Sequence, residues 1–183
     1  MREKIKVKGM VTVRVLDKDG NVKRNKQGIF RRLLRIKGRP MLYQHHNIVT
    51  RTGDALIADA LLPNPNKAKV SSASGFIQVG TGWTGNSTKT NTNCNTPTGA
   101  AEELDENYPV LKAAWGSVGD TTICYRTTFE AGDLNANGIN EAALLNGSGS
   151  GAACLAYAQI TPSVNVTSAD TLQVVWEITI LGQ

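Results

Sequence analysis

The strongest constraint on the fold of this chain is the alternation of apolar and polar residues near its C-terminal end. In residues 170–181, DTLQVVWEITIL, an apolar side chain recurs at every second position. Because successive side chains of a β-strand point to opposite faces of a sheet, this period predicts a strand with one face in the core and one on the surface. Such half-buried strands are typical of antiparallel sheets packed in two layers.

A second alternating segment lies near the start of the chain. Residues 4–16, KIKVKGMVTVRVL, predict a strand, which we expect to carry a bulge at Gly9. An Asp-Gly turn follows, and residues 22–36 are expected to return as a second, strongly basic strand or extended arm. Residues 1–46 are therefore predicted to form a basic N-terminal strand pair or arm.

One short helix is predicted at residues 53–62, where Ala and Leu recur at helical spacing before a Pro. Thr52 or Asp54 would lie near its N-terminus, where a side-chain oxygen accepts hydrogen bonds from unpaired backbone N–H groups. The residues expected to face the core are Leu56, Ala60 and Leu61.

The remaining strands are predicted from short apolar runs between turn-forming residues. These runs are residues 76–79, 110–118, 121–131 and 154–160. Residues 83–100 contain almost no apolar side chain and predict a long polar loop, which is often functional or ordered by a partner. We therefore predict a mainly β protein, in which residues 47–183 form an antiparallel β-sandwich with one short helix.

The net charge of +5 divides into two parts of opposite sign. Residues 1–62 contain 15 Lys and Arg against 5 Asp and Glu, a formal charge of +10, whereas the remaining residues contain 5 against 10, a charge of −5. This asymmetry predicts an acidic partner for the N-terminal part, which could be nucleic acid, another protein or the acidic part of a neighbouring copy. Sequence-specific nucleic-acid binding is not expected, because aromatic residues are few in the basic segment and no recognition-helix pattern is present.

A charged interface is the favoured interpretation of the basic segment. We add Trp83, because it stands at the start of the long polar loop. The residues predicted to contact a partner are Arg24, Lys26, Arg31, Arg32, Arg35, Lys37, Arg39 and Trp83.

Two short motifs resemble ligand-binding loops but lack an essential residue. Residues 80–87, GTGWTGNS, have the glycine spacing of a phosphate-binding loop, but Asn86 stands where the phosphate-binding Lys is required. Residues 133–144 begin like a calcium-binding EF-hand loop, yet Leu144 replaces the bidentate carboxylate at the twelfth position. Glu141 could partly substitute, but a plain Asn-Gly turn is favoured.

Other candidate chemistry is sparse. The three cysteines are an odd number without metal-binding spacing, and only Cys94, in the polar loop, is expected to be reactive. His45 and His46 are adjacent, so their side chains diverge and make a poor joint metal site. We therefore expect a non-enzymatic protein with no metal or cofactor. No membrane association is expected, because no run of about 18 apolar residues exists and the first residues lack the apolar core of a secretory signal.

The order of five segments resembles a pattern in structural proteins of tailed bacteriophages. The pattern has an extended lead-in, an N-x-V-T-x-x-G helix, a V-G-T-G strand end, a G-I-x-E strand and a closing D-T-L-x-V-x-W-x-I strand. The segments here are VTVRVLDKDGNV, HNIVTRTGDALIADALL, FIQVGTGWTGNSTKT, TTFEAGDLNANGINEAALLN and AYAQITPSVNVTSADTLQVVWEITI. The Asn- and Thr-rich insertion after Gly85 and the cationic stretch from Lys23 to Arg39 depart from the pattern.

The resemblance implies a β-rich virion component, made in the cytoplasm of the bacterial host, with no catalytic residues to carry over. We expect a tail, baseplate or fibre subunit that assembles with copies of itself and with other virion proteins. A capsid decoration protein on the head surface is the alternative. A host-surface carbohydrate-binding module is an alternative of another class, with Trp83, Trp115 and Tyr125 as candidate stacking residues, although the last two are expected to serve the core.

Overall fold

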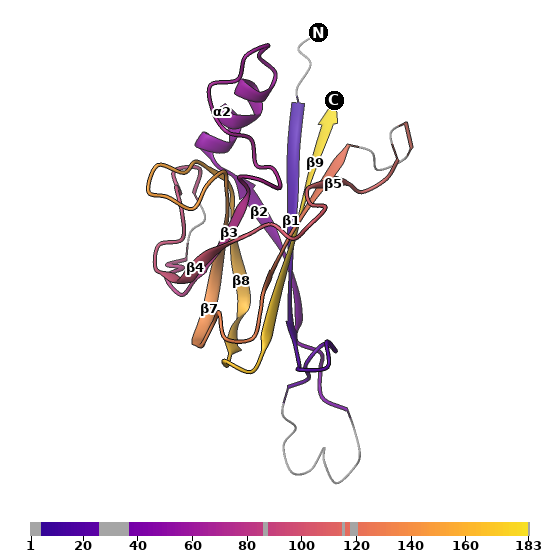
Figure 1. Cartoon of the computed structure of the whole chain (residues 1–183), viewed down its shortest axis with the longest axis vertical. Helices are drawn as coiled ribbons and strands as arrows, with labels where there is room; N and C mark the ends of the chain where they lie inside the picture. Colours follow the sequence, from indigo (N-terminus) through magenta and orange to yellow (C-terminus); the bar gives the residue numbers. More distant parts are fainter. Residues whose placement is uncertain (1–4, 26–36, 86–87, 115, 118–120, 183) are drawn as a thin grey trace.

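The computed structural model describes residues 5–25, 37–85, 88–114, 116–117 and 121–182 (Figure 1). Within these residues nine strands form one sheet, and α2 is the one helix. Their bounds are β1 Ile5–Leu16, β2 Leu42–Val49, α2 Arg51–Ala60, β3 Phe76–Gly80, β4 Pro97–Glu103, β5 Val110–Leu111, β6 Thr122–Phe129, β7 Ala136–Leu145, β8 Cys154–Val166 and β9 Thr171–Gly182. The prediction of a mainly β protein with a short helix is confirmed.

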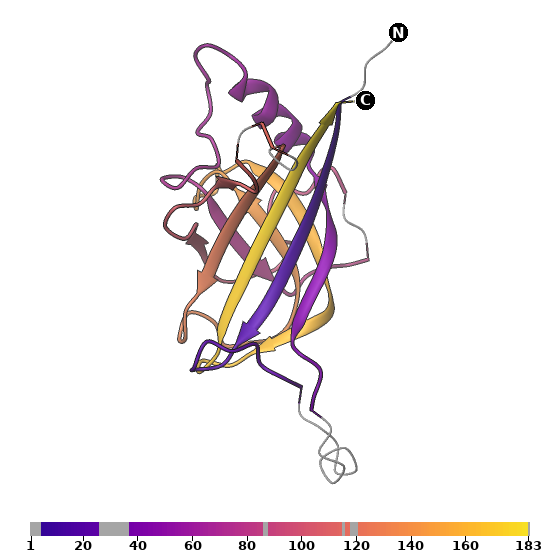
Figure 2. The same ribbon diagram turned by 90° about the vertical axis from the view of Figure 1, so that its right-hand side faces the viewer.

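The strands lie in the order β4-β3-β7-β8-β2-β1-β9-β6-β5, and every neighbouring pair is antiparallel. The sheet curls around the core, so the two packed layers are halves of one continuous sheet (Figures 1 and 2). The end of β4 meets β6, because Thr127 Oγ1 donates to the Glu103 carbonyl oxygen (3.1 Å) and the backbone N–H of Asp105 donates to the Arg126 carbonyl oxygen (2.8 Å).

The two alternating segments of the sequence form the adjacent central strands β1 and β9, as predicted. They pair along their whole length, from Ile5 opposite Gly182 to Leu16 opposite Thr171. Their apolar faces are buried in the core. The fully buried residues of these faces are Val11, Val13, Val15, Leu172, Val174 and Trp176.

The predicted bulge at Gly9 is wrong, because the register of β1 with β9 runs through this residue without interruption, and the register with β2 is regular from Gly9 to Arg14. The glycine instead leaves room for a side chain of the neighbouring strand. A Cβ atom at Gly9 would lie 1.7 Å from Oδ1 of Asn47 on β2, so the side chain of Asn47 occupies the space.

The predicted return of residues 22–36 beside β1 is present at its start, because Val22 bridges Leu16 and the backbone N–H of Lys23 donates to Val15 O (2.7 Å). Residues 26–36 lie outside the described residues, and β2 is the strand that pairs with β1 from Arg14 to Gly9. Residues 23–25 also pair with residues 39–41, and we call residues 22–25 and 37–41 together the hairpin stem. The backbone N–H of Asn25 donates to Arg39 O (3.0 Å), and that of Met41 donates to Lys23 O (2.7 Å). The predicted boundary between an N-terminal arm and a sandwich, at residue 46, therefore falls inside β2, and β1 belongs to the centre of the sheet.

Helix α2 begins two residues earlier than predicted, because Thr50 is its N-cap: its side-chain oxygen accepts a hydrogen bond from the backbone N–H of Gly53 (2.9 Å). Thr50 and Thr52 also donate to the carbonyl oxygen of Cys154, which ties the helix to β8. No described helix is long and apolar enough to span a lipid bilayer.

The side of α2 that meets the core is narrower than predicted. Leu56 is buried, as expected, but Ala60 is exposed and Leu61 keeps 82% of its surface accessible. The prediction that Ala60 and Leu61 face the core is therefore wrong, since the chain leaves the helix before another element covers them.

Most of the other predicted strands are present. Residues 76–79 lie in β3, residues 121–131 contain β6, and residues 154–160 begin β8. In the described part of 110–118, however, only Val110–Leu111 is a strand, and the last residues of the predicted polar loop begin β4.

Candidate assembly interface

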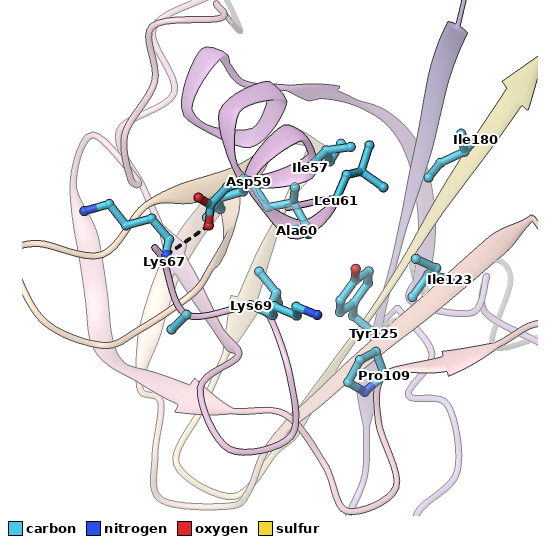
Figure 3. A pocket seen from close by; sticks show the side chains of 14 residues that line it. Ile57, Asp59, Ala60, Leu61, Lys67, Lys69, Pro109, Ile123, Tyr125 and Ile180 are labelled. Carbon is cyan, nitrogen blue, oxygen red and sulfur yellow. Dashed lines mark hydrogen bonds between the residues drawn. The ribbon is translucent and has the colours of Figure 1, made fainter. Parts of the chain in front are cut away.

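An apolar groove of about 310 Å³ lies between α2 and the sheet. Figure 3 shows Ile57 and Leu61 on the helix side, facing Ile180 of β9, with Ile123 and Tyr125 of β6 nearby. The segment of residues 67–70 forms a further wall. We call this feature the apolar groove. It exists because α2 contacts the sheet through its first turns and leaves its last turn standing clear of β6 and β9.

Large apolar side chains are exposed beside the groove. Leu61 and Leu62 are 82% and 49% exposed, and Val110 and Leu111 of the short edge strand β5 are each 40% exposed. Pro109, which precedes β5, lines the groove itself. A cluster of exposed apolar side chains beside a concavity is typical of a surface that contacts another molecule.

Four polar side chains belong to the lining of the groove, those of Asp59, Lys67, Lys69 and Tyr125, and two of them lie next to its apolar residues. The ring of Tyr125 is 5% exposed and its hydroxyl group points into the groove, while the ammonium group of Lys69 approaches it from the opposite wall (Figure 3). Burial raises the pKa of Tyr125 to about 12. The hydroxyl group is therefore protonated at neutral pH and can donate or accept a hydrogen bond with whatever enters the groove.

The groove has an acidic neighbour. A second hollow shares Pro109 with it and is lined by Glu103 and Glu106, both exposed. Burial, together with the negative charges of Asp133 and Glu103, raises the pKa of Glu102, the residue before Glu103 on β4. An occupant that carries apolar and basic side chains would suit the groove and this hollow together.

The hairpin stem lies at the end of the sheet opposite α2 (Figures 1 and 2). Of the predicted contact residues, it holds Arg24, Lys37 and Arg39, all exposed, and Arg24 Nη1 donates to the Gly38 carbonyl oxygen (2.7 Å). The other four basic residues lie outside the described residues: Lys26, Arg31, Arg32 and Arg35.

The stem is fastened to the body by a partly buried ion pair. Lys23 Nζ donates to both carboxylate oxygens of Asp170 (2.7 and 2.6 Å), and the side chain of Asp170 is only 6% exposed. Burial opposes ionisation of Asp170, but the hydrogen bonds from Lys23 and Thr167 outweigh it and lower the pKa of this carboxyl group. The basic stem is therefore held in a defined position by the β8–β9 turn.

Trp83, the eighth predicted contact residue, belongs to a different region. It is half-buried and packs against a small second core on the outer face of β7 and β8. Trp83 does not line the apolar groove. Its backbone N–H donates a hydrogen bond to Oδ1 of Asn140 (3.0 Å). The structure therefore does not bring Trp83 together with the basic residues. Tyr125 is buried, as expected, and Trp115 lies outside the described residues.

The polar loop is held against the sheet by Glu141. This side chain is fully buried, and its carboxylate accepts hydrogen bonds from the backbone N–H groups of Gly82, Asn95 and Thr96 (each 2.9 Å) and from the hydroxyl group of Tyr157 (2.5 Å). Burial, together with the Glu141 carboxylate, raises the pKa of Tyr157 well above its usual value. Glu141 therefore organises the polar loop, and the printed partners of its carboxylate belong to this loop and to Tyr157 of β8.

The prediction that Cys94 is reactive is wrong. Its side chain is buried in the second core, where Sγ donates to the Gln78 carbonyl oxygen (3.3 Å). Burial and the nearby charge of Glu141 raise the pKa of Cys94 well above its usual value. Thiolate, the reactive form, is therefore strongly disfavoured.

Metal-ligating side chains are not gathered in the part of the chain that the structure describes: no group of three or more His, Cys, Asp and Glu residues there could hold an ion. His45 Nε2 accepts a hydrogen bond from the backbone N–H of Thr161 (3.0 Å), and His46 is exposed.

The comparisons with known proteins add no relative: no family model, curated protein or solved structure matches this chain.

The apolar groove was not among the predicted contact sites. One signal for it exists in the sequence, since Leu61 and Leu62 stand directly before the turn-forming PNPN, where a helix has ended and burial is difficult to achieve.

Proposed function

We propose that this chain is a non-enzymatic structural subunit of a tailed bacteriophage particle, associated with the tail, that acts by binding copies of itself and other virion proteins. The observation that carries the proposal is the presence of two unlike contact surfaces at opposite ends of the sheet. One is the apolar groove with its acidic neighbour, and the other is the basic hairpin stem.

Unlike surfaces at opposite ends favour head-to-tail contacts. Such contacts generate rings when the rotation between subunits closes and open helical stacks when it does not. Tubes, baseplates and fibres are built from rings or stacks of this kind, and repeated weak contacts add up to a stable particle.

The phage context rests on the sequence resemblance. The resembling segments form β1, α2 with the end of β2, β3, β7 and the β8–β9 hairpin, which are elements of the body of the fold. The cationic departure begins and ends in the hairpin stem, and the Asn- and Thr-rich departure lies in the polar loop. Segments that depart from the shared pattern are where we expect the contacts specific to one kind of phage particle.

The proposal is tested on purified virions. Particles are banded by density gradient from a lysate in which the gene is expressed during infection, and their tryptic peptides are measured by mass spectrometry. We expect peptides of this chain at an abundance comparable with known tail proteins, and gold-labelled antibody at the tail in electron micrographs. A chain that is abundant in the lysate but absent from banded particles contradicts the proposal. Gold confined to the head surface would replace the tail placement by capsid decoration.

A further inference from the structure

The apolar groove has room for apolar side chains from another chain. An apolar cavity of about 150 Å³ accommodates one benzene-sized group, so a groove of about 310 Å³ accommodates about two such groups. Leu61, 82% exposed at its rim, gains buried surface only when an occupant arrives. The groove therefore favours an occupant that presents two or more bulky apolar residues.

Such residues occur in the chain itself. Residues 26–36, KQGIFRRLLRI, lie outside the described residues and contain five large apolar and four basic side chains. Both ends of this segment leave the hairpin stem, between Asn25 and Lys37. Its composition combines apolar side chains that would fill the groove with positive charges that would suit the carboxylates of Glu103 and Glu106 in the adjoining hollow.

The segment cannot reach the groove of its own copy. Tyr125, on the side of the groove nearer the stem, is opposite Trp176 and therefore level with Val11, which is five residues of β1, or ~17 Å, from Leu16. The stem carries the ends of the segment farther away, because Asn25 pairs with Arg39, two residues beyond the Met41 that pairs with Val15, which adds ~7 Å. Eleven residues tied at both ends reach outward by at most ~20 Å. The groove that the segment can enter therefore belongs to another copy.

We propose that residues 26–36 of one copy occupy the apolar groove of the next copy, so that the subunits join head to tail. The exposed stem residues Arg24, Lys37 and Arg39 would then approach the acidic hollow beside the groove. This inference deepens the proposed function, on which it rests, by naming the two surfaces of the self-contact.

The test uses the full chain and two variants, one for each surface. Leu61→Gln alters the groove, and Phe30→Gln alters the segment. Leu62→Gln is the matched control, because Leu62 is also exposed, is adjacent in sequence and does not line the groove. Equal thermal unfolding of all four proteins shows that the fold is intact, and analytical ultracentrifugation from about 1 to 100 μM, a range of ordinary protein affinities, measures association.

We expect the wild type and Leu62→Gln to associate, and Leu61→Gln and Phe30→Gln each to associate at least about tenfold more weakly, since burial of one large apolar side chain changes an equilibrium constant by about 10- to 100-fold. A one-to-one mixture of the two weak variants should form dimers, because each supplies the intact surface that the other lacks. A wild type that stays monomeric, or a mixture that fails to form dimers, overturns the inference. Neither result bears on the presence of the chain in virions, which the particle analysis tests separately.

Discussion

Replacement of Glu141 should release the polar loop from the sheet. Its carboxylate is fully buried and accepts hydrogen bonds from three loop N–H groups and from Tyr157. Glu141→Ala leaves all four donors without an acceptor. No other described carboxylate accepts hydrogen bonds from these groups, so the loop loses its main attachment.

The magnitude follows from the number and kind of these bonds. A hydrogen bond to a charged group contributes about 1.5–3 kcal/mol, and four of them would set an upper limit of about 6–12 kcal/mol. The loss should be smaller, because Asn95 and Thr96 are exposed and their amides regain water once the loop opens. We expect Glu141→Ala to lower the free energy of unfolding by about 3–5 kcal/mol, the usual effect of breaking a buried charged network.

Two related variants separate the contributions. Tyr157→Phe removes one donor and should cost about 2 kcal/mol. Glu130→Ala is the matched control, because Glu130 is exposed, and it should change the stability by less than about 0.5 kcal/mol.

Urea unfolding gives the free energies, and hydrogen exchange with mass spectrometry locates the effect. In Glu141→Ala we expect faster exchange at Gly82, Asn95 and Thr96 than in β1 and β9. If Glu141→Ala unfolds within about 1 kcal/mol of the wild type and the loop amides keep their protection, the assigned role of Glu141 is refuted.

Four further outcomes are expected. The pKa of Asp170 is lowered in the folded state, so the ionised carboxylate of Asp170 stabilises the fold above the unfolded pKa of about 3.9. This stabilisation is lost as pH falls through the folded pKa. Urea unfolding at pH 3 and 7 should therefore show a smaller pH dependence of stability in Asp170→Asn than in the wild type. Gly53→Ala should destabilise by about 1–3 kcal/mol in thermal unfolding, because the added Cβ would lie 2.0 Å from Leu155 O, whereas unchanged stability would show that the helix shifts freely. Cys124, the half-buried thiol, should react with a thiol reagent before the two buried cysteines, and simultaneous labelling of all three would contradict the burial described above. Self-association should weaken as salt rises, because screening reduces the attraction between basic and acidic ends, and a salt-independent association constant in sedimentation would argue against charge pairing.

The strands that could be predicted are those whose burial follows a local pattern. The alternation in residues 4–16 and 170–181 identifies β1 and β9, because a half-buried strand must place every second side chain in the core. Helix α2 is predicted to within two residues of its ends for a similar reason, since helical spacing is local, although the capping residue is Thr50 rather than the predicted Thr52 or Asp54.

The errors arise where a distant segment decides the outcome. The Asp-Gly turn after β1 does form, with the backbone N–H of Gly20 donating to Asp17 O (2.9 Å). Of the described residues that follow the turn, only Val22 and Lys23 pair with the end of β1, and β2 pairs with β1 from Arg14 to Gly9. Cys94 lies in a polar stretch of sequence but is buried, because Glu141, 47 residues further along the chain, draws the loop onto the sheet. Leu61 is exposed because nothing in the described structure covers the last turn of α2.

The sequence by itself determines the strand-rich character of the protein, the position of the helix and the separation of charge between its two parts, because these depend on residues close together in the chain. Only the tertiary structure decides the order of the strands, the burial of Glu141 and the placement of an apolar groove and a basic stem at opposite ends. The physical reason is that strand pairing and burial depend on contacts between residues far apart in sequence, and a local pattern does not specify which segments will meet.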